Sequence, residues 1–245
     1  MDSPHSEPAL VITRVAEHQW HALSDDRVVG RAEASPRPDG RLFLSIDTWH
    51  SDDFARLASA MLPALPRPLY TVVDEADDEL KSHWERAGFA TRRREWEYVV
   101  PTAPGTVPPG VTIGPATDQD QLRALDDVIR AEVAWSSMPA EVLPRPDGAW
   151  DLAKYVVASE SGVPVGLARL GPLRRQTRIG LLAVRAGRRR HGIGRALLTH
   201  VLDSLYRRGI ESVSFEVDET NSAAIALADG AGARRAGSTV ELVVR

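Results

Sequence analysis

Residues 188–195 read Arg-Arg-Arg-His-Gly-Ile-Gly-Arg, and this stretch separates two segments with different apolar patterns. The segment before it, residues 179–184, is a continuous apolar run with the length of a buried strand. The segment after it has the apolar spacing of one helical face and stops at Gly209, a residue typical of a helix end. Its apolar side chains are Leu197, Leu198, Val201, Leu202 and Leu205. The pattern predicts a strand, an Arg- and Gly-rich loop and a helix.

The loop has the properties of an anion-binding site. A helix N-terminus carries unpaired backbone N–H groups and a partial positive charge, and both favour a bound anion. Gly192 and Gly194 lack a Cβ atom, so a phosphate can approach the backbone closely. The neighbouring arginines can add charge-assisted hydrogen bonds to phosphate oxygens. We therefore interpret the loop as a binding site for a diphosphate.

The spacing in the loop excludes two common diphosphate motifs. A P-loop requires Gly-Lys-Ser/Thr, whereas Gly194 is followed by Arg195, and a dinucleotide fingerprint requires a third glycine where Leu197 stands. The remaining pattern, Arg-x-x-Gly-x-Gly at residues 189–194, resembles the coenzyme A pyrophosphate loop of the GNAT N-acetyltransferase superfamily.

The residues around the loop extend this resemblance to approximately residues 111–245. Residues 183–184 (Ala-Val) end the preceding strand, as in that family. A second strand at residues 213–217 leads to Asn221, and residues 231–233 (Ala-Gly-Ala) stand where the family usually has Leu-Gly-Phe. The resemblance implies an α/β (α+β) fold in which a mixed, mostly antiparallel central sheet is flanked by helices.

The composition of the 245 residues excludes several functions. The formal net charge is −4, so the chain as a whole lacks the basic surface of a nucleic-acid-binding protein. The absence of cysteine excludes disulfides, a cysteine-ligated metal and a cysteine acyl-enzyme, and we expect no metal site. Residues 1–8 lack the pattern of a signal peptide, and no apolar run reaches membrane-spanning length. We expect a cytoplasmic protein that binds neither membranes nor nucleic acid.

A Pro-rich stretch divides the chain. Four prolines and two glycines within residues 101–110 cannot continue a helix or a central strand, so we interpret this stretch as an extended linker. The predicted organisation is a first domain at residues 1–100 and a second domain at residues 111–245. Both are expected to be GNAT-like.

The two predicted domains share short matches that keep their order. Residues 73–75 (Val-Asp-Glu) recur at residues 217–219, an offset of 144, and residues 41–46 match residues 178–183 at an offset of 137. These matches indicate an internal duplication. The two offsets make the first copy 7 residues shorter, 144 − 137, in the interval that contains the loop.

In place of the loop, the first copy has Thr-Trp-His-Ser-Asp-Asp-Phe at residues 48–54, without glycine and with two carboxylates. Such a segment would repel a diphosphate. Ser51 and Asp52 are interpreted as the cap of the next helix. One intact and one degenerate copy resemble tandem GNAT proteins.

The second copy has an additional segment, residues 118–154, which begins with an amphipathic helical pattern. In GNAT domains the equivalent segment usually forms the acceptor side of the cleft. It contains eight acidic and four basic residues, and a net-acidic wall suits a cationic amine. Trp135 and Met138 are candidates to line the acceptor pocket, although packing in the core would explain them equally well.

The resemblance assigns acetyl-CoA, as a substrate, to the strand end, the loop and the residue after the next strand. The side chain of Asn221 would fix the pantetheine by hydrogen bonding, and the backbone N–H of Val184 would stabilise the oxyanion. The complete set of candidate cofactor-binding residues is Leu182, Ala183, Val184, Arg189, Arg190, His191, Gly192, Ile193, Gly194, Arg195 and Asn221.

Two positions depart from the family's catalytic pattern. Arg178 stands where many relatives have a catalytic Glu, and Ala228 stands where many have a Tyr that protonates the leaving sulfur. A thiol has a pKa of about 8.5, so its anion can leave without an acid. A base is still needed, directly or through a water. Candidates that complete the catalytic set with Val184 are Glu216, Asp218 and Glu132.

The sequence thus predicts an N-acetyltransferase in which a primary amine, expected on a small molecule, attacks acetyl-CoA directly in a ternary complex. The alternatives are an enzyme that acetylates protein N-termini or lysines, and an acyl-CoA-binding sensor without catalysis. The losses at Arg178 and Ala228 motivate the sensor. The first copy is expected to pack against the second or to form a homodimer through its exposed edge strand.

Overall fold

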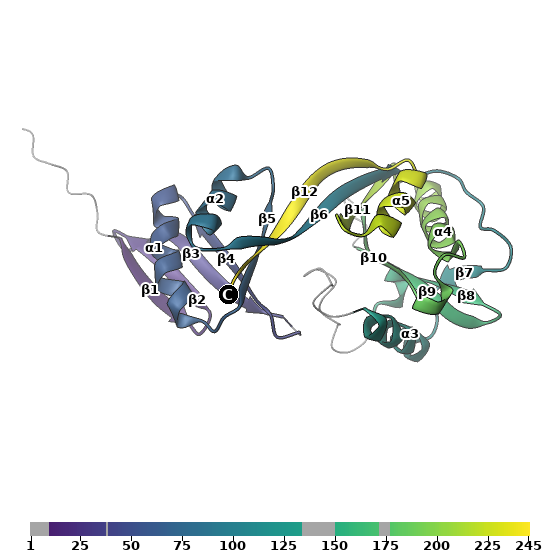
Figure 1. Ribbon diagram of the computed structural model, residues 1–245, viewed down its shortest axis with the longest axis horizontal. Helices are drawn as coiled ribbons and strands as arrows, with labels where there is room; N and C mark the ends of the chain where they lie inside the picture. Colours follow the sequence, from purple (N-terminus) through teal and green to yellow (C-terminus); the bar gives the residue numbers. More distant parts are fainter. Residues whose placement is uncertain (1–9, 38, 134–149, 172–176) are drawn as a thin grey trace, which may run out of the picture. The chain divides into compact units, whose positions relative to one another are not determined.

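The computed structural model describes residues 10–37, 39–133, 150–171 and 177–245, and these form two compact units (Figure 1). The first unit combines the chain up to Arg94 with Ser238–Arg245. The second unit is Glu95–Gly237. Each is built around a mostly antiparallel sheet, so the predicted α/β fold with a mixed sheet and flanking helices is confirmed.

The sheet of the first unit has the strand order β1-β2-β3-β4-β5-β12. Neighbouring strands are antiparallel except for the parallel pair β4–β5. Its elements are β1 (Val11–Ala16), β2 (Gln19–Ser24), β3 (Arg27–Pro36), β4 (Leu42–Thr48), α1 (Ser51–Met61), the 3-10 turn η1 (Leu62–Ala64), β5 (Leu69–Asp74), α2 (Asp78–Arg86) and the end of β12 (Arg234–Val244).

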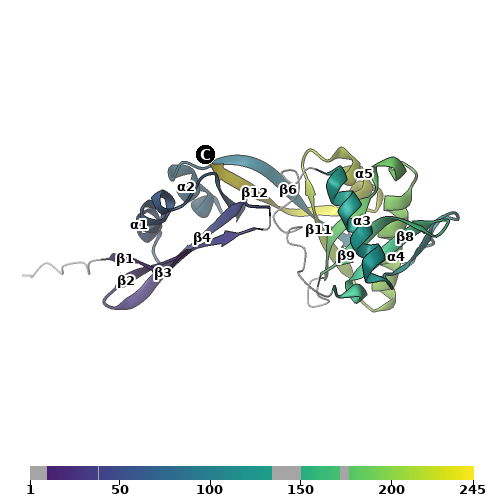
Figure 2. The same cartoon turned by 90° about the horizontal axis from the view of Figure 1, so that it is seen from below.

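Both helices of the first unit cover the same face of its sheet (Figure 2). Phe54 and Leu57 of α1 and Trp84 of α2 are buried in one apolar core, and the Phe54 and Trp84 rings meet edge to face at 5.0 Å. Strand residues with alternating burial, such as Leu69 and Val73 of β5, complete this core. Among the described residues of this unit, no helix covers the opposite face.

The sheet of the second unit has the order β6-β11-β10-β9-β8-β7, with one parallel pair, β10–β11. Its elements are β6 (Ala90–Pro101), β7 (Thr112–Pro115), α3 (Gln119–Glu132), η3 (Leu152–Lys154), β8 (Tyr155–Glu160), β9 (Val163–Leu170), β10 (Thr177–Val184), η4 (Ala186–Arg188), α4 (Ile193–Arg207), β11 (Ser212–Asp218) and α5 (Ser222–Gly230).

Helices cover both faces of this second sheet (Figure 1). On one face, Leu122, Leu125 and Ile129 of α3 pack against Leu167 of β9. On the other face, α4 packs against β8, β9 and β10 through its apolar stripe, as its sequence pattern predicts. The strand–loop–helix unit around residues 188–195 is therefore confirmed.

The last strands of the two sequence repeats are exchanged between the units. Residues Glu95–Pro101 of β6 pair with β11 in the second unit, whereas residues 239–244 of β12 pair with β5 in the first. The predicted boundaries at residues 100 and 111 therefore do not coincide with the compact units. Local sequence cannot reveal this exchange. The strands β6 and β12 have similar apolar patterns, so either could pair with β5 or with β11. Residues 102–110 lack helix and strand, as the predicted linker requires.

Residues 144 positions apart have the same local structure at the two ends of α2 and α5. The Oδ1 atom of Asp77 accepts the N–H of Leu80 at 2.9 Å to cap α2, and that of Asn221 accepts the N–H of Ala224 at 3.0 Å to cap α5. Gly88 and Gly232 end these helices with φ of +94° and +74°. These turns keep the same geometry in both repeats.

The sequence predicts an offset of 136 where residues 29–30 match residues 165–166, and the strand register extends this offset to the ends of β4 and β10, in place of the predicted 137. Gly30 pairs with Thr48 and Gly166 with Val184, a difference of 136 for both members of the pair. A bulge in β10 between Ile179 and Leu181 changes the offset between β4 and β10 again, because Leu170 pairs with Ile179 whereas Ala34 pairs with Leu44. The predicted cap at Ser51 and Asp52 is also wrong: the N-cap of α1 is His50, without a side-chain cap.

The strand exchange makes residues near the C-terminal end of β12 essential to the first unit. Leu242 is fully buried in that unit's core. Leu242→Ala should lower the free energy of unfolding by about 2–5 kcal/mol, because it leaves a cavity. Val72→Ala, at an exposed site on the adjacent β5, is the matched control and should change it far less. Equal losses in denaturant titrations would contradict the exchanged arrangement.

The carboxylate of Glu75, next to the paired residues of β5 and β12, should make the stability of the first unit sensitive to acid. Hydrogen bonds from Arg94 and Ser238 lower the pKa of Glu75 below its ordinary 4.5. Its contribution to folding is therefore present above pH 4.5 and is lost as the pH falls through the lowered value. Glu75→Gln should flatten the dependence of the melting temperature on pH in this acidic range, and an unchanged slope would refute this role.

Candidate functional site

The Arg- and Gly-rich loop leads from the end of β10 to the N-terminus of α4. Arg190 and Gly192 have positive φ values of +68° and +81°, and Gly192 is the N-cap. No described side chain caps α4. The N–H groups of its first turn are therefore not occupied by a side-chain cap and can donate to a ligand in the loop. This is the geometry of a helix N-terminal anion site.

The predicted loop residues divide into two groups. Arg189, Arg190, His191 and Arg195 are exposed, as ligand contact requires. Ile193, by contrast, is 1% exposed and anchors α4 in the core, so only its backbone N–H can face a ligand.

Gly194 is half-buried next to the end of β10, where an added Cβ would lie 3.8–3.9 Å from Leu182, Leu227 and Val184. The Nε of Arg189 donates to the carbonyl oxygen of Val184 at 3.0 Å. This bond ties the loop back to the strand end.

The parallel ladder between β10 and β11 ends early. It pairs Thr177 with Val213 and Arg178 with Ser214, and among the described residues it goes no further, although β10 continues to Val184. The backbone groups that point from the rest of β10 toward β11 are therefore not used by this ladder. An extended ligand could bind them as a strand would.

The direction of the Val184 N–H follows from its neighbour. The N–H of Arg185 donates to the carbonyl oxygen of Val165 at 2.9 Å, on the β9 side. Successive residues of a strand direct their N–H groups to opposite sides, so the N–H groups of Val184 and Leu182 point to the β11 side. Ala183 directs its N–H toward β9. The predicted oxyanion donor thus points to the side where the ladder has ended.

Glu132 lies beside the loop, but its carboxylate has a partner there. Its Oε2 atom accepts the N–H of Ala186 at 2.5 Å, and its Oε1 lies 3.9 Å from the Nε of Arg185. It therefore joins the end of α3 to the loop. The sequence predicts Glu132 only as a candidate base, because its contact with Ala186 joins residues 54 positions apart.

The other two candidate bases are also engaged. Glu216 forms an ion pair with Arg178, which belongs to the last pair of the β10–β11 ladder. Asp218 accepts the N–H of Thr220 at 2.7 Å and also the Thr220 hydroxyl, at the turn into α5. Glu216 is thus the candidate nearest to the point where β10 and β11 separate.

The remaining predicted positions have structural partners. Asn221 uses its Oδ1 to cap α5, which leaves its amide NH2 group for a ligand. Ala228, at the position of the missing Tyr, is fully buried against Tyr98 and Val217. On α4, burial lowers the pKa of His200 below its ordinary 6.5.

Two of the acidic residues in the predicted acceptor segment form ion pairs with basic residues of the same segment. Asp126 pairs with the buried Arg130 at 2.5 Å, and Asp151 lies 3.2 Å from the Nζ of Lys154. Trp135 and Met138 lie outside the described residues. Within the described residues, no three His, Cys, Asp or Glu side chains gather into a metal site, and no helix could cross a membrane.

Removing the hydrogen bond between Glu132 and the Ala186 N–H, which we call the Glu132 tether, should increase local opening of the loop. Glu132→Ala deletes the acceptor of the Ala186 N–H, and we expect faster hydrogen exchange at Ala186 by about tenfold, the effect of about 1.4 kcal/mol. Glu132→Gln keeps an acceptor oxygen and is the matched variant. Exchange rates that stay the same in Glu132→Ala would contradict the tether.

Comparison with known proteins was consistent with this geometry. Residues 125–232 match the model of the Acetyltransferase (GNAT) family. The "[Ribosomal protein bS18]-alanine N-acetyltransferase" of Escherichia coli (strain K12) is 45% identical over 51 residues. The match covers 21% of this chain and 34% of that enzyme, so it spans about a third of the length of this relative.

Two solved structures cover nearly all of the chain. A GCN5-related N-acetyltransferase from Sphaerobacter thermophilus has a TM-score of 0.69 at 19% identity, covering 95% of this chain and 82% of that one. A tandem GNAT protein from the clavulanic acid biosynthesis pathway has a TM-score of 0.65 at 16% identity, covering 98% and 84%. The matched residues contain the loop, α4 and both parallel strands, and together with the shared fold they support the GNAT acetyltransferase family for this chain.

Proposed function

We propose that the second unit binds acetyl-CoA and transfers its acetyl group to a primary amine. The observation that carries this proposal is the early end of the β10–β11 ladder directly before an uncapped helix N-terminus. A diphosphate at the N-terminus of α4 would be held by backbone N–H groups and by Arg190 and Arg195. The pantetheine arm would then extend along the free side of β10 and reach Asn221.

The acetyl transfer requires few protein groups. The amine nitrogen attacks the thioester carbonyl carbon, whose oxygen accepts a hydrogen bond from the Val184 N–H while negative charge develops. The carbon–sulfur bond breaks and the thiolate leaves. The nitrogen loses its second proton as the amide forms, and this proton passes to the thiolate or to water. An alkyl ammonium has a pKa of about 10.4, so a carboxylate or water must take one proton before or during attack. We assign this role to Glu216, acting after it separates from Arg178 or through water.

We infer that the two units arose by duplication and that the first has lost coenzyme A binding. The order β3-β4-α1-β5-α2 repeats as β9-β10-α4-β11-α5. In the first unit α1 begins at Ser51, directly after the β4–α1 connection at Trp49 and His50. This connection is too short for the loop that precedes α4, and it ends in the acidic first turn of α1.

For the acceptor we propose a small-molecule amine. An N-terminal amine of a protein is the second candidate, because the 51-residue match is to an enzyme that acetylates an alanine of a ribosomal protein. A non-catalytic acyl-CoA sensor is the third, because all three candidate bases have partners. Release of free coenzyme A in the presence of a panel of amines and an Ala-initiated peptide separates these cases. A sensor binds acetyl-CoA without consuming it.

Acetyl-CoA should stabilise the wild-type protein and not the Gly192→Ala variant. At 100 times its dissociation constant, the ligand adds about 2.7 kcal/mol to the free energy of unfolding. Alanine is strained at φ +81°, and its methyl group would face the phosphates. Gly187→Ala is the matched control, since nothing lies within 4 Å of its added Cβ and φ is not positive. A thermal melt unaffected by acetyl-CoA in all three proteins would refute the proposed function.

A further inference from the structure

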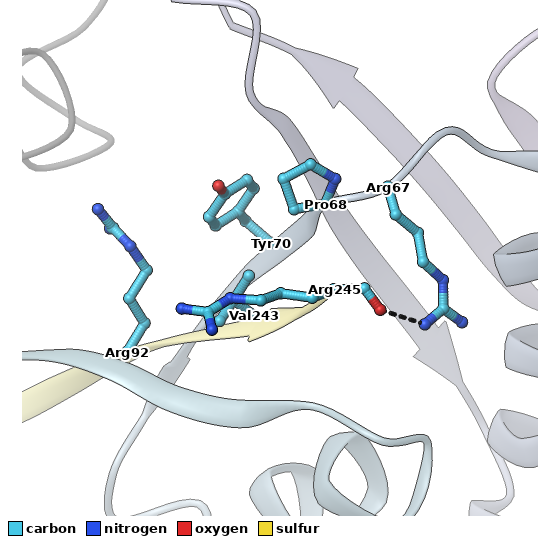
Figure 3. Close-up of a pocket in the computed structure, with 6 residues that line it drawn as sticks. All are labelled: Arg67, Pro68, Tyr70, Arg92, Val243 and Arg245. Carbon is cyan, nitrogen blue, oxygen red and sulfur yellow. Dashed lines mark hydrogen bonds between the residues drawn. The ribbon is translucent and has the colours of Figure 1, made fainter.

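The face of the first sheet that carries no described helix contains a cavity of about 350 Å³. It is lined by Arg67, Pro68, Tyr70, Arg92, Val243 and Arg245 (Figure 3). Tyr70 and Val243 are a cross-strand pair of β5 and β12. A cavity of this size lies at the lower end of the range for small-molecule sites. All of its lining belongs to the first unit.

The cavity presents a concentration of hydrogen-bond donors. The guanidinium groups of Arg92 and Arg245 and the hydroxyl of Tyr70 lie on the same side of the view in Figure 3. Arg67 points elsewhere: its Nη1 donates to the backbone oxygen of Arg245 at 2.7 Å and holds that residue in place. Among the described residues, no Asp or Glu side chain forms an ion pair with Arg67 or Arg245.

A buried network orients the inner part of the cavity. Glu241 is 5% exposed and forms ion pairs with both Arg41 and Arg92. The guanidinium carbons of these arginines lie 5.6 and 5.7 Å from the centroid of the Tyr70 ring, which stacks on Phe43 at 5.4 Å. The positions of Tyr70 and Arg92 are thus set before any ligand binds, which lowers the entropic cost of binding.

These features are absent from the second repeat. At the offset of 144, Arg67 corresponds to Glu211, Tyr70 to Ser214, Arg92 to Ala236 and Arg245 to Pro101. The strands are equivalent, but their cationic and aromatic side chains are not. The cavity is therefore a property of the first copy and not of the shared fold.

We propose that this cavity binds the phosphoryl group of a small phosphomonoester. Guanidinium groups form charge-assisted hydrogen bonds with phosphate oxygens, and a phosphoryl group presents three oxygens in different directions to Arg92, Arg245 and Tyr70. A carboxylate offers only two oxygens in one plane. The volume corresponds to about twelve waters at about 30 Å³ each, which leaves space beyond the phosphoryl group. The ring of Tyr70 and the apolar surfaces of Pro68 and Val243 would contact the organic part.

Titrations of the full chain, followed by the backbone amide signals of Tyr70 and Val243 in NMR spectra, test the proposal. The probes are phenyl phosphate, inorganic phosphate and benzoate. Phenyl phosphate should bind most tightly, inorganic phosphate more weakly, and benzoate weakest. Arg245→Gln should weaken phenyl phosphate binding by about tenfold, because it removes a charged donor. Arg27→Gln removes an exposed arginine that does not line the cavity, and it should leave the affinity unchanged.

Other outcomes would overturn the proposal. Benzoate binding as tight as that of phenyl phosphate would make the site one for carboxylates. Equal affinities in Arg245→Gln and Arg27→Gln, with both variants folded by circular dichroism, would place the ligand elsewhere. Gly192→Ala should leave these signals and affinities unchanged, because it alters the loop of the second unit. Loss of phenyl phosphate binding in Gly192→Ala would assign that binding to the loop of the second unit. This outcome does not depend on whether the loop also binds acetyl-CoA.

Discussion

The hydrogen-bonded ladder between β10 and β11 ends after two residue pairs, and the geometry of the candidate site depends on that end. A longer ladder would use the N–H groups of Leu182 and Val184 within the sheet. Because it stops at Arg178, the last residues of β10 have their strand partners in β9, through pairs such as Val184–Gly166. The close approach of Gly166 is part of this constraint, since an added Cβ would lie 3.1 Å from the Ala183 carbonyl oxygen.

The exchange of β6 and β12 links the folding of the two units. The first sheet lacks the strand that pairs with β5 until residues 239–244 join it, and the second requires a strand from the first repeat. Each pairing buries apolar residues, such as Leu242 in the first unit and Val100 in the second. The core of each unit therefore contains a strand from the other half of the sequence.

Local sequence signals predicted the parts of this structure that depend on local contacts. The apolar run, the Gly-rich loop and the amphipathic helix around residues 188–195 are adjacent in the chain, and the structure has all three. The contacts missed were distant in sequence. Glu132 meets Ala186 across 54 residues, and β12 finds β5 rather than β11. The bulge in β10 was missed because residues 179–184 are a continuous apolar run, which has no polar–apolar alternation for an inserted residue to interrupt.

The two repeats differ where their backbones leave the end of the parallel strand. Eight residues, 185–192, connect Val184 to Ile193, whereas two residues, Trp49 and His50, connect Thr48 to Ser51 in the first repeat. A diphosphate site built from backbone N–H groups cannot fit so short a turn. Side-chain donors have no such length requirement. The first unit, which has only two residues at this connection, presents arginines instead on the face of its sheet that no described helix covers.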